Sequence, residues 1–366
     1  MYYEDRLANN SGCRMALDDL CRGSAKVPGG IDITAPWLHT VQVTDLSILH
    51  GLINAVKGWY QVPDLQARTI GSSVELIHIS SLMLDDSASR LLLRQGRPAA
   101  HVVFGVERTV QSCKFMTIRG VKALEKLKNS RCMRVLLDEI VRKALTRNRK
   151  EIHPFTSAYN HCYPSIEDHI KALEKRSGSI IHLIKDLMTA ASPLPSHKRP
   201  HSDHLIALFA RLYAIRDDYA NLPTLSTNFA PNLGLQAKVQ SFYVALDEGK
   251  YSLLLRHALS VLPDDKAQLL KDMIVQRRVF GSFSEEHKPF VLEILRGCGS
   301  FEFVVGLIQR LQGAIFEDLV KLTLDRKGLP LDEAVYLTDD HSGYSVSPDL
   351  GYEVVWEREE SVAVWA

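Results

Sequence analysis

The feature that most constrains the fold is an apolar pattern of helical period that recurs along most of the chain. In residues 43–62 and 65–86, apolar side chains return every three or four positions, the spacing that gives a helix one apolar face. No βαβ alternation or short repeat accompanies the pattern, so the sequence predicts an all-α helical bundle. The same pattern recurs in residues 131–145, 165–175, 179–191, 202–222, 235–247, 253–262 and 302–324.

The two ends of the chain differ from this central part. The first 40 residues are polar and carry the breakers VPGG and Pro36, which are typical of an arm or a short lead-in. From about Leu329 the chain is richer in Tyr, Val and Asp, as in an extended flap or a loose segment. We therefore expect an N-terminal arm, a helical domain and a C-terminal extension, over residues 1–40, 41–328 and 329–366.

Composition and charge exclude several classes of function. A net charge of +1 with 24% charged residues predicts neither nucleic acid nor an anionic membrane as a partner. The six cysteines show no CxxC or metal-ligand spacing, so neither a zinc site nor a disulfide framework is expected. The N-terminus has no signal-peptide pattern, and no stretch has the apolar length of a membrane span. These features predict a cytoplasmic protein.

Two aspartate pairs stand at the ends of strongly apolar stretches. Asp85-Asp86 follows HISSLML, and Asp217-Asp218 follows LFARLYAIR, about 130 residues later. Carboxylates in such places cost free energy unless a cation meets them, and Mg²⁺ commonly joins one or two carboxylates to substrate phosphates. One pair alone is most often a solvated helix end. Two pairs on facing helices of a bundle indicate a metal and phosphate site in a central cavity.

The sequence around both pairs resembles a known family. Residues 75–101, ELIHISSLMLDDSASRLLLRQGRPAAH, resemble the first aspartate-rich region of geranylgeranyl diphosphate synthases, and RDDYANL resembles the second. YPSIEDHIKALEKRSGS, FYVALDEGKYSL and CGSFEF resemble their Lys-Thr helix, EGK segment and C-terminal signature. The resemblance to these trans-prenyl diphosphate synthases runs from about Thr44 to Gln312. It implies the isoprenoid synthase-type helical bundle around a central cavity.

The resemblance also implies a set of site residues, together with a homodimer. Its aspartate motifs imply catalytic Mg²⁺ binding, its basic motifs imply contacts to an allylic prenyl diphosphate, and we expect aromatic side chains to line the cavity. The implied metal ligands are Asp85, Asp86, Asp217, Asp218 and Asn221, and the four aspartates are the catalytic residues. The implied diphosphate ligands are Arg94, Arg176 and Lys250. The aromatic candidates are Phe104, Phe155, Tyr213 and Phe242.

The chain departs from the family on the side that binds isopentenyl diphosphate. The family's Gly-Lys-x-x-Arg aligns with residues 45–49, where Leu46 and Leu49 replace both cations. The Arg-Arg pair becomes Arg94-Gln95, which keeps the arginine that serves the allylic diphosphate in the family and loses the other. Leucines cannot hold a diphosphate, so the resemblance implies that this subsite is lost.

The allylic side keeps more of the family pattern. Arg176 stands in place of the lysine of the Lys-Thr motif, Ser177 in place of its threonine, and Lys250 matches the EGK lysine. The first aspartate motif ends at Ser89 instead of a third aspartate, so we expect weaker metal binding there. The second motif must then hold more of the metal than is usual.

With these changes, we expect the chain still to ionise an allylic diphosphate but no longer to bind isopentenyl diphosphate. The nearest nucleophile for the carbocation is then a distal double bond of the same chain, and the reaction is cyclisation. The pattern resembles the atypical fungal sesquiterpene cyclases of the α-humulene synthase type. That resemblance implies farnesyl diphosphate as substrate, closure of an eleven-membered ring and loss of a proton. Ser80 and Ser81, just before the first motif, predict a deep cavity that does not exclude a diterpene substrate.

Two other functions compete with cyclisation. A prenyltransferase with a neutral acceptor such as an indole would also manage without the lost cations. A catalytically inactive partner subunit is favoured by Ser89, but it has no chemical need for RDDYANL or for Arg94.

Overall fold

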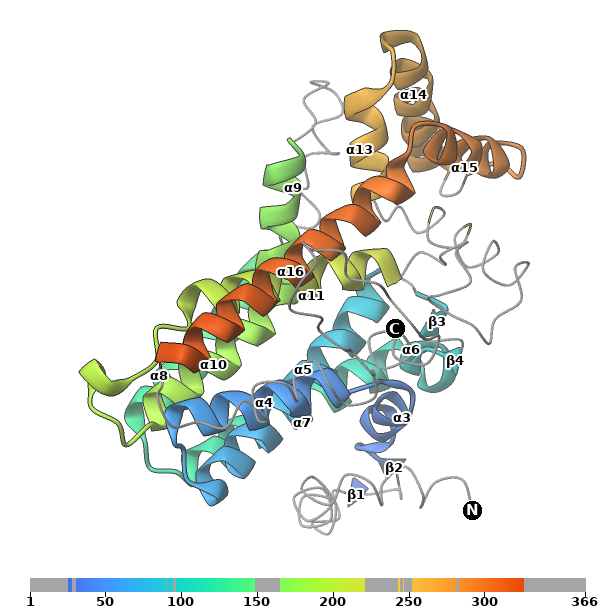
Figure 1. Ribbon diagram of the computed structural model, residues 1–366. Helices are drawn as coiled ribbons and strands as arrows, with labels where there is room; N and C mark the ends of the chain where they lie inside the picture. The colour runs from blue at the N-terminus through green and yellow to red at the C-terminus, as the bar shows by residue number, and fades with distance from the viewer. Residues whose placement is uncertain are drawn as a thin grey trace, which may run out of the picture. The chain divides into compact units, whose positions relative to one another are not determined.

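The computed structural model describes residues 26–27, 31–89, 91–94, 97–148, 165–220, 243, 246, 252–280 and 283–325 (Figure 1). Across these residues the regular structure is almost entirely helical, which confirms the all-α prediction. The chain divides into two compact units, Met1–Arg142 with Ile180–Pro200 and Lys143–Ser179 with His201–Ala366. Each unit is described by itself.

The first unit is built around the packing of α5 on α7. Its helices are α3 (Ala35–Val43), α4 (Ser47–Tyr60), α5 (Asp64–Ser89), α6 (Ala100–Phe104), α7 (Val106–Glu125), most of α8 (Ser130–Asn148) and of α10 (Ser179–Ala191), and the 3₁₀ turn η3 (Ser196–Lys198). Its strands form two short antiparallel pairs, β1 (Lys26–Val27) with β2 (Ile31–Asp32) and β3 (Leu93–Arg94) with β4 (Arg97–Pro98).

Gly120 explains why α5 and α7 approach so closely. A Cβ at this position would lie 2.9 Å from Cγ1 of Ile77 and 3.1 Å from the carbonyl oxygen of Ser73. The Ser73 hydroxyl donates a 2.8 Å hydrogen bond to the Gly120 carbonyl. Apolar side chains such as Ile70 and Met116 are buried on the same two helices. The absence of a side chain at Gly120 therefore lets the two backbones meet, which fixes the long helix that carries the first aspartate pair.

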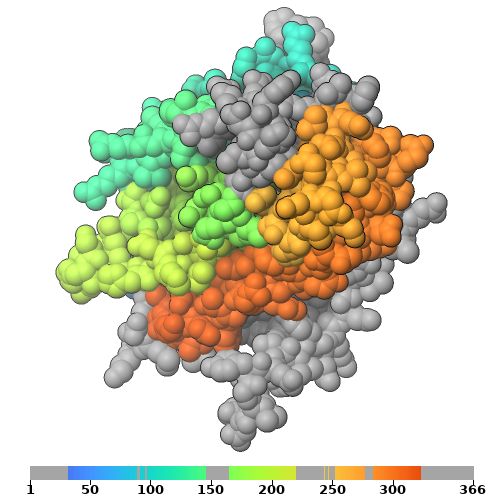
Figure 2. Space-filling view, turned by 90° about the horizontal axis from the view of Figure 1, so that it is seen from above, coloured from blue at the N-terminus to red at the C-terminus, as the bar shows by residue number. Residues whose placement is uncertain are grey.

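The second unit is built around α11 and α16, which pack side by side. Its elements are α9 (Ile166–Leu173), the π-helical turn η2 (Glu174–Gly178), α11 (Asp203–Ala220), α13 (Leu253–Val261), α14 (Asp264–Phe280), α15 (His287–Gly297) and α16 (Ser300–Asp325). Figure 2 shows the surfaces of the last helices of this unit, in orange and red, gathered together. α9 and η2 also pack against α11, and Gly178 of η2 lies close to the carbonyl oxygen of Ala210.

The apolar pattern in the sequence predicted most of these helices. The helices that it missed have physical explanations. In α7 the buried face is formed partly by Thr109, Ser112 and Cys113, so few large apolar side chains mark it in the sequence. Pro36, interpreted as a breaker, occupies the first turn of α3, where proline is favoured because its missing N–H has no intrahelical acceptor. The segment 235–247 lies outside the described residues except at positions 243 and 246. None of the described helices is both long and apolar enough to span a membrane.

Ser165 caps α9, and removing its hydroxyl is expected to destabilise the protein. Its oxygen accepts a 3.0 Å hydrogen bond from the Asp168 N–H and donates one of 2.7 Å to the Asp168 carboxylate. We expect Ser165→Ala to lower the free energy of unfolding by about 1 kcal/mol, as measured by urea denaturation. Ser196→Ala, at an exposed serine in η3, is the matched control. Equal effects of both changes would contradict the capping role.

Candidate functional site

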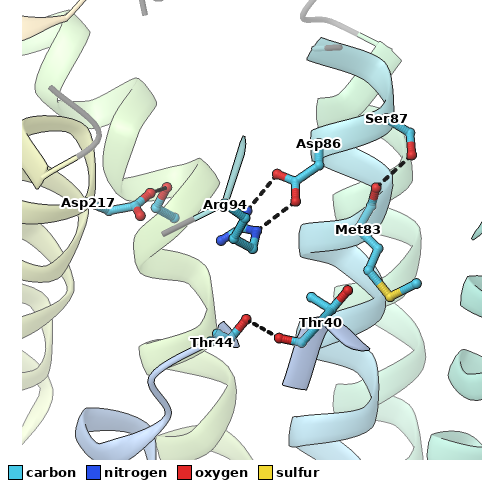
Figure 3. A network of polar contacts seen from close by, with 8 residues as sticks. Thr40, Thr44, Met83, Asp86, Ser87, Arg94 and Asp217 are labelled. Atoms are coloured by element: carbon cyan, nitrogen blue, oxygen red, sulfur yellow. Dashed lines mark hydrogen bonds and ion pairs between the residues drawn. The ribbon is translucent and has the colours of Figure 1, made fainter. Parts of the chain in front are cut away.

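The first aspartate pair lies in the last turn and a half of α5 in the first unit. Asp86 is buried, with 4% of its surface exposed. Arg94, on the short strand β3, donates from Nε to one carboxylate oxygen of Asp86 and from Nη2 to the other, both at 2.6 Å (Figure 3). The β3–β4 hairpin follows α5 directly and returns Arg94 to this helix. The result is a two-pronged, charge-assisted contact that fixes the guanidinium plane.

Asp85 differs from its neighbour in exposure. Its side chain is half-buried, whereas that of Asp86 is buried. The next hydroxyl, Ser87, donates back to the carbonyl oxygen of Met83 at 2.9 Å (Figure 3). The side chain of Ser89 and the whole of Gln95 lie outside the described residues.

The positions that would bind isopentenyl diphosphate are part of the apolar core. Leu46 and Leu49, before and within the first turn of α4, are 9% and 5% exposed. Beside them on α4, His50 lies 3.6 Å from a carboxylate oxygen of Glu75, which is itself buried. His78 is also buried, with 7% exposed. The loss of both cations is therefore accompanied by packing of the leucines that replace them.

This packing gives a direct mutational test of the lost subsite. We expect Leu49→Lys to lower the free energy of unfolding by roughly 3 kcal/mol, because the new charge enters an apolar core. Leu65→Lys is the control, since Leu65 on α5 is 77% exposed and a change there should stay within about 0.5 kcal/mol. Chemical denaturation of both variants measures the difference. If the two were equally stable, position 49 would be open to solvent or ligand.

The second aspartate pair lies near the end of α11 in the second unit. Ser177, in the π-helical turn η2, donates a 2.8 Å hydrogen bond to a carboxylate oxygen of Asp217. Asp218 is 9% exposed and accepts a 2.8 Å hydrogen bond from the backbone N–H of Leu253, at the start of α13. Burial, followed by the charge of Glu302, raises the pKa of Tyr219 to about 12. The phenol of Tyr219 is therefore neutral at every physiological pH.

The π-helical turn places the serine that contacts Asp217. A π-helical turn inserts an extra residue into a helix and often marks a functional position. Gly178 makes the close approach of this turn to α11 sterically acceptable, because a Cβ there would lie 2.6 Å from the carbonyl oxygen of Ala210. Arg176, in the same turn, has an exposed side chain. The sequence identified Ser177 only as a replacement for threonine, and its role as partner of Asp217 becomes visible in the structure.

The remaining site residues predicted from the sequence fall into two groups. Phe104 on α6 is half-buried, with the His39 ring edge-on at 5.6 Å and the Arg108 guanidinium 5.2 Å from its centroid. Tyr213 on α11 is also half-buried. Their assignment to a cavity lining stays a prediction. The predicted residues outside the described part of the chain are Phe155, Asn221, Phe242 and Lys250.

The carboxylates of the two aspartate pairs are ligands of the type that a hard divalent cation prefers. Within the described residues, no cluster of three or more His, Cys, Asp or Glu side chains forms a ready-made metal site. Each unit instead offers a half-buried aspartate, Asp85 in one and Asp217 in the other. Mg²⁺ usually takes one or two carboxylates, several waters and substrate phosphates rather than an all-protein cage. The residues present therefore fit Mg²⁺ that arrives with a diphosphate.

Comparison with known proteins places this chain among prenyl-chain enzymes. Residues 47–282 match the family model described as polyprenyl synthetase. Talaropentaene synthase of Talaromyces verruculosus is 33% identical over 293 residues, which are 80% of this chain and 41% of that protein. The bifunctional sesterterpene synthase astC of Talaromyces wortmannii is 29% identical, over 78% of this chain and 36% of that protein.

The match covers a larger share of a third relative than of the two terpene synthases. Geranylgeranyl pyrophosphate synthase A of Phomopsis amygdali is 28% identical over 81% of this chain, and the match covers 72% of that protein. By contrast, the chain spans only about two-fifths of the length of the terpene synthases that it matches. The matched stretch is therefore most of a prenyl diphosphate synthase but a minor part of each terpene synthase.

Proposed function

The chain belongs to the polyprenyl synthetase family, and from that premise we propose that it ionises an allylic prenyl diphosphate and cyclises the product without isopentenyl diphosphate. The observation that carries this proposal is the burial of Leu46 and Leu49 where the family has its two isopentenyl diphosphate cations. Without a second diphosphate site, the carbocation has no external prenyl nucleophile. A double bond of its own chain is then the closest reacting partner.

We propose specific chemistry for the retained half of the site. Arg94, held by Asp86, would contact the diphosphate, and a guanidinium suits a phosphate. Asp85 and Asp217 would hold Mg²⁺, which when bound neutralises the charge of the departing diphosphate. Cyclisation also requires that water be kept from the ionised substrate, because water would otherwise capture the cation.

The proposed substrate is farnesyl diphosphate, and the proposed product is a sesquiterpene of the α-humulene type. The support for this choice is the resemblance of the motifs to fungal α-humulene synthases. The relatives include a bifunctional sesterterpene synthase, so the experiment must also offer longer substrates.

The second candidate function is transfer of a farnesyl or geranylgeranyl group to an acceptor other than isopentenyl diphosphate, such as an indole. One observation favours it: the matched stretch covers most of a geranylgeranyl pyrophosphate synthase and only a minor part of the terpene synthases. A neutral acceptor needs neither of the cations that Leu46 and Leu49 replace.

Product analysis separates the candidate functions. The purified chain is incubated with Mg²⁺ and geranyl, farnesyl or geranylgeranyl diphosphate, with and without indole, and the extracts are analysed by gas chromatography with mass spectrometry. We expect a cyclic hydrocarbon from farnesyl diphosphate alone. Prenylated indole with no cyclic hydrocarbon would support the transferase instead. The absence of diphosphate release from every substrate would reject both activities.

A further inference from the structure

A second cluster of reactive side chains lies in the second unit, where α15 ends and α16 begins. The Sγ atom of Cys298 lies 3.1 Å from Oγ of Ser300, and the same Oγ lies 3.0 Å from Nδ1 of His257 on α13. The packing of α13 against α15 and α16 brings the three side chains together. A thiol, a hydroxyl and an imidazole are therefore joined in one hydrogen-bonded chain that includes neither aspartate pair.

The turn between α15 and α16 explains why Cys298 and Ser300 meet. Cys298 is the C-cap of α15, and Ser300 is the first residue of α16. Gly299, between them, has a φ of 69°, in the left-handed region that glycine adopts without strain. This break between the helices places the side chains of Cys298 and Ser300, two positions apart in the chain, within hydrogen-bonding distance.

The Ser300 hydroxyl is placed to pass on a proton. Ser300 is 0% exposed, and its hydroxyl carries one hydrogen, so it satisfies both contacts by donating to one partner and accepting from the other. In one arrangement the thiol of Cys298 donates to Ser300, which donates to Nδ1 of His257. In the other, protonated His257 donates to Ser300, which donates to the thiolate. The two arrangements are the states before and after transfer of one proton from Cys298 to His257.

The surroundings of His257 suit a proton acceptor. Burial lowers the pKa of its imidazole below the ordinary value, so the ring is neutral at pH 7 and keeps an unprotonated nitrogen. The ring of Phe303 stacks on it, with the centroids 4.2 Å apart and 19° between the planes. This stacking holds the imidazole in place. The aromatic face also attracts the imidazolium that forms when the proton arrives.

Cys298 differs from the other cysteines in the described part of the chain. Cys113 and Cys132 are buried, whereas Cys298 is half-buried. Burial raises the pKa of the Cys132 thiol, which keeps that thiol protonated and unreactive. Cys298 also lies 3.6 Å from the carbonyl oxygen of Leu295, but a carbonyl is not a base. Of these three thiols, Cys298 therefore combines exposure with a path to a base.

We propose that Cys298 is a site of reversible covalent modification by low-molecular-mass disulfides such as glutathione disulfide, with Ser300 and His257 as its proton relay. The thiol passes its proton through Ser300 to His257, and the thiolate attacks one sulfur of the disulfide. A new S–S bond forms to Cys298 while the old S–S bond breaks. The departing thiolate keeps the bonding electron pair and takes up a proton, and His257 releases the proton that it received. One disulfide replaces another, so no further oxidant is needed.

The test measures the rate at which glutathione disulfide modifies each cysteine of the full chain, by mass spectrometry of its peptides. We expect Cys298 to gain one glutathionyl group, which dithiothreitol removes, while Cys113 and Cys132 stay unmodified. Ser300→Ala and His257→Asn should each slow the reaction at Cys298 by roughly 10-fold or more, because the thiol loses its path to a base.

Ser260→Ala is the matched control for the loss of a hydroxyl. Ser260 on α13 donates a 2.7 Å hydrogen bond to the backbone carbonyl oxygen of His257 and is not part of the relay. The rate at Cys298 should therefore stay within about twofold of that in the unaltered chain. His257→Asn separates hydrogen bonding from proton transfer, because an amide still accepts a hydrogen bond but is not a base. A full rate in this variant would show that His257 is not the base.

The direction of each change distinguishes a proton relay from a structural role. Loosening of the turn would expose Cys298 and speed its modification, whereas loss of the relay slows it. An unchanged or raised rate in Ser300→Ala would overturn the proposal, and so would resistance of Cys298 to glutathione disulfide in the unaltered chain. The measurement needs no prenyl substrate, so its outcome is independent of the proposed cyclase activity.

Discussion

Replacing Asp217 with alanine is expected to lower magnesium-dependent diphosphate release by roughly 100-fold or more, a loss on the scale of removing one strong electrostatic group from a catalytic site. Asp217 is the half-buried member of its pair, and the Ser177 hydroxyl orients its carboxylate. Alanine removes both carboxylate oxygens, so the departing diphosphate loses a metal ligand. Release of inorganic diphosphate from farnesyl diphosphate, followed by a coupled colour assay, measures the effect.

The matched control for this change lies on the same helix. Asp203 is exposed in the first turn of α11, so Asp203→Ala removes an identical side chain at the opposite end. Its turnover should stay within about twofold of the unaltered chain, because surface substitutions of this kind have small effects. Full turnover by Asp217→Ala would show that the metal assignment at the second motif is wrong.

Gly178→Ala is expected to destabilise the second unit and to reduce turnover. The added Cβ would lie 2.6 Å from the carbonyl oxygen of Ala210 and 3.1 Å from its carbonyl carbon. Because these are backbone atoms, they cannot rotate away as a side chain could, and relief requires η2 to move from α11. Such overpacking costs about 1–3 kcal/mol. The same movement would pull Ser177 from Asp217, so turnover should fall together with stability.

Gly313→Ala provides the comparison for this prediction. Gly313 lies on α16, and a Cβ there would meet nothing within 4 Å. Alanine at an open helical position is expected to raise stability by about 0.5–1 kcal/mol. Urea denaturation of both variants measures whether each change raises or lowers the free energy of unfolding. If Gly178→Ala were also stabilising, η2 would not be packed against α11 as closely as the structure describes.

The local helical signals and the aspartate motifs could be predicted from the sequence because they depend on residues close together in the chain. The period around Asp85 located α5, the period before Asp217 located α11, and the family match confirms the prenyl synthase resemblance. By contrast, α7 was not predicted, since its buried face carries small and polar residues such as Thr109 and Gly120. A buried face of this kind contains few large apolar side chains, which are the signal that a sequence reading looks for.

The partners of the two buried aspartates, Asp86 and Asp218, could not be predicted from the sequence. The partner of Asp218 is a backbone N–H, that of Leu253, and a backbone group has no sequence signature. The partner of Asp86 is Arg94, which the family pattern assigns to the substrate alone. The homodimer, the cytoplasmic location and the boundaries of the three predicted parts stay predictions.

The central claim is that the chain keeps the allylic diphosphate subsite and has lost the isopentenyl diphosphate subsite. The most direct test measures whether isopentenyl diphosphate is incorporated into the product. The chain is incubated with Mg²⁺ and farnesyl diphosphate, with and without radiolabelled isopentenyl diphosphate, and both released diphosphate and labelled product are counted. We expect diphosphate release at the same rate in both incubations, with label in the product at background, because Leu46 and Leu49 are buried leucines. Label recovered in a longer linear prenyl diphosphate would contradict the account.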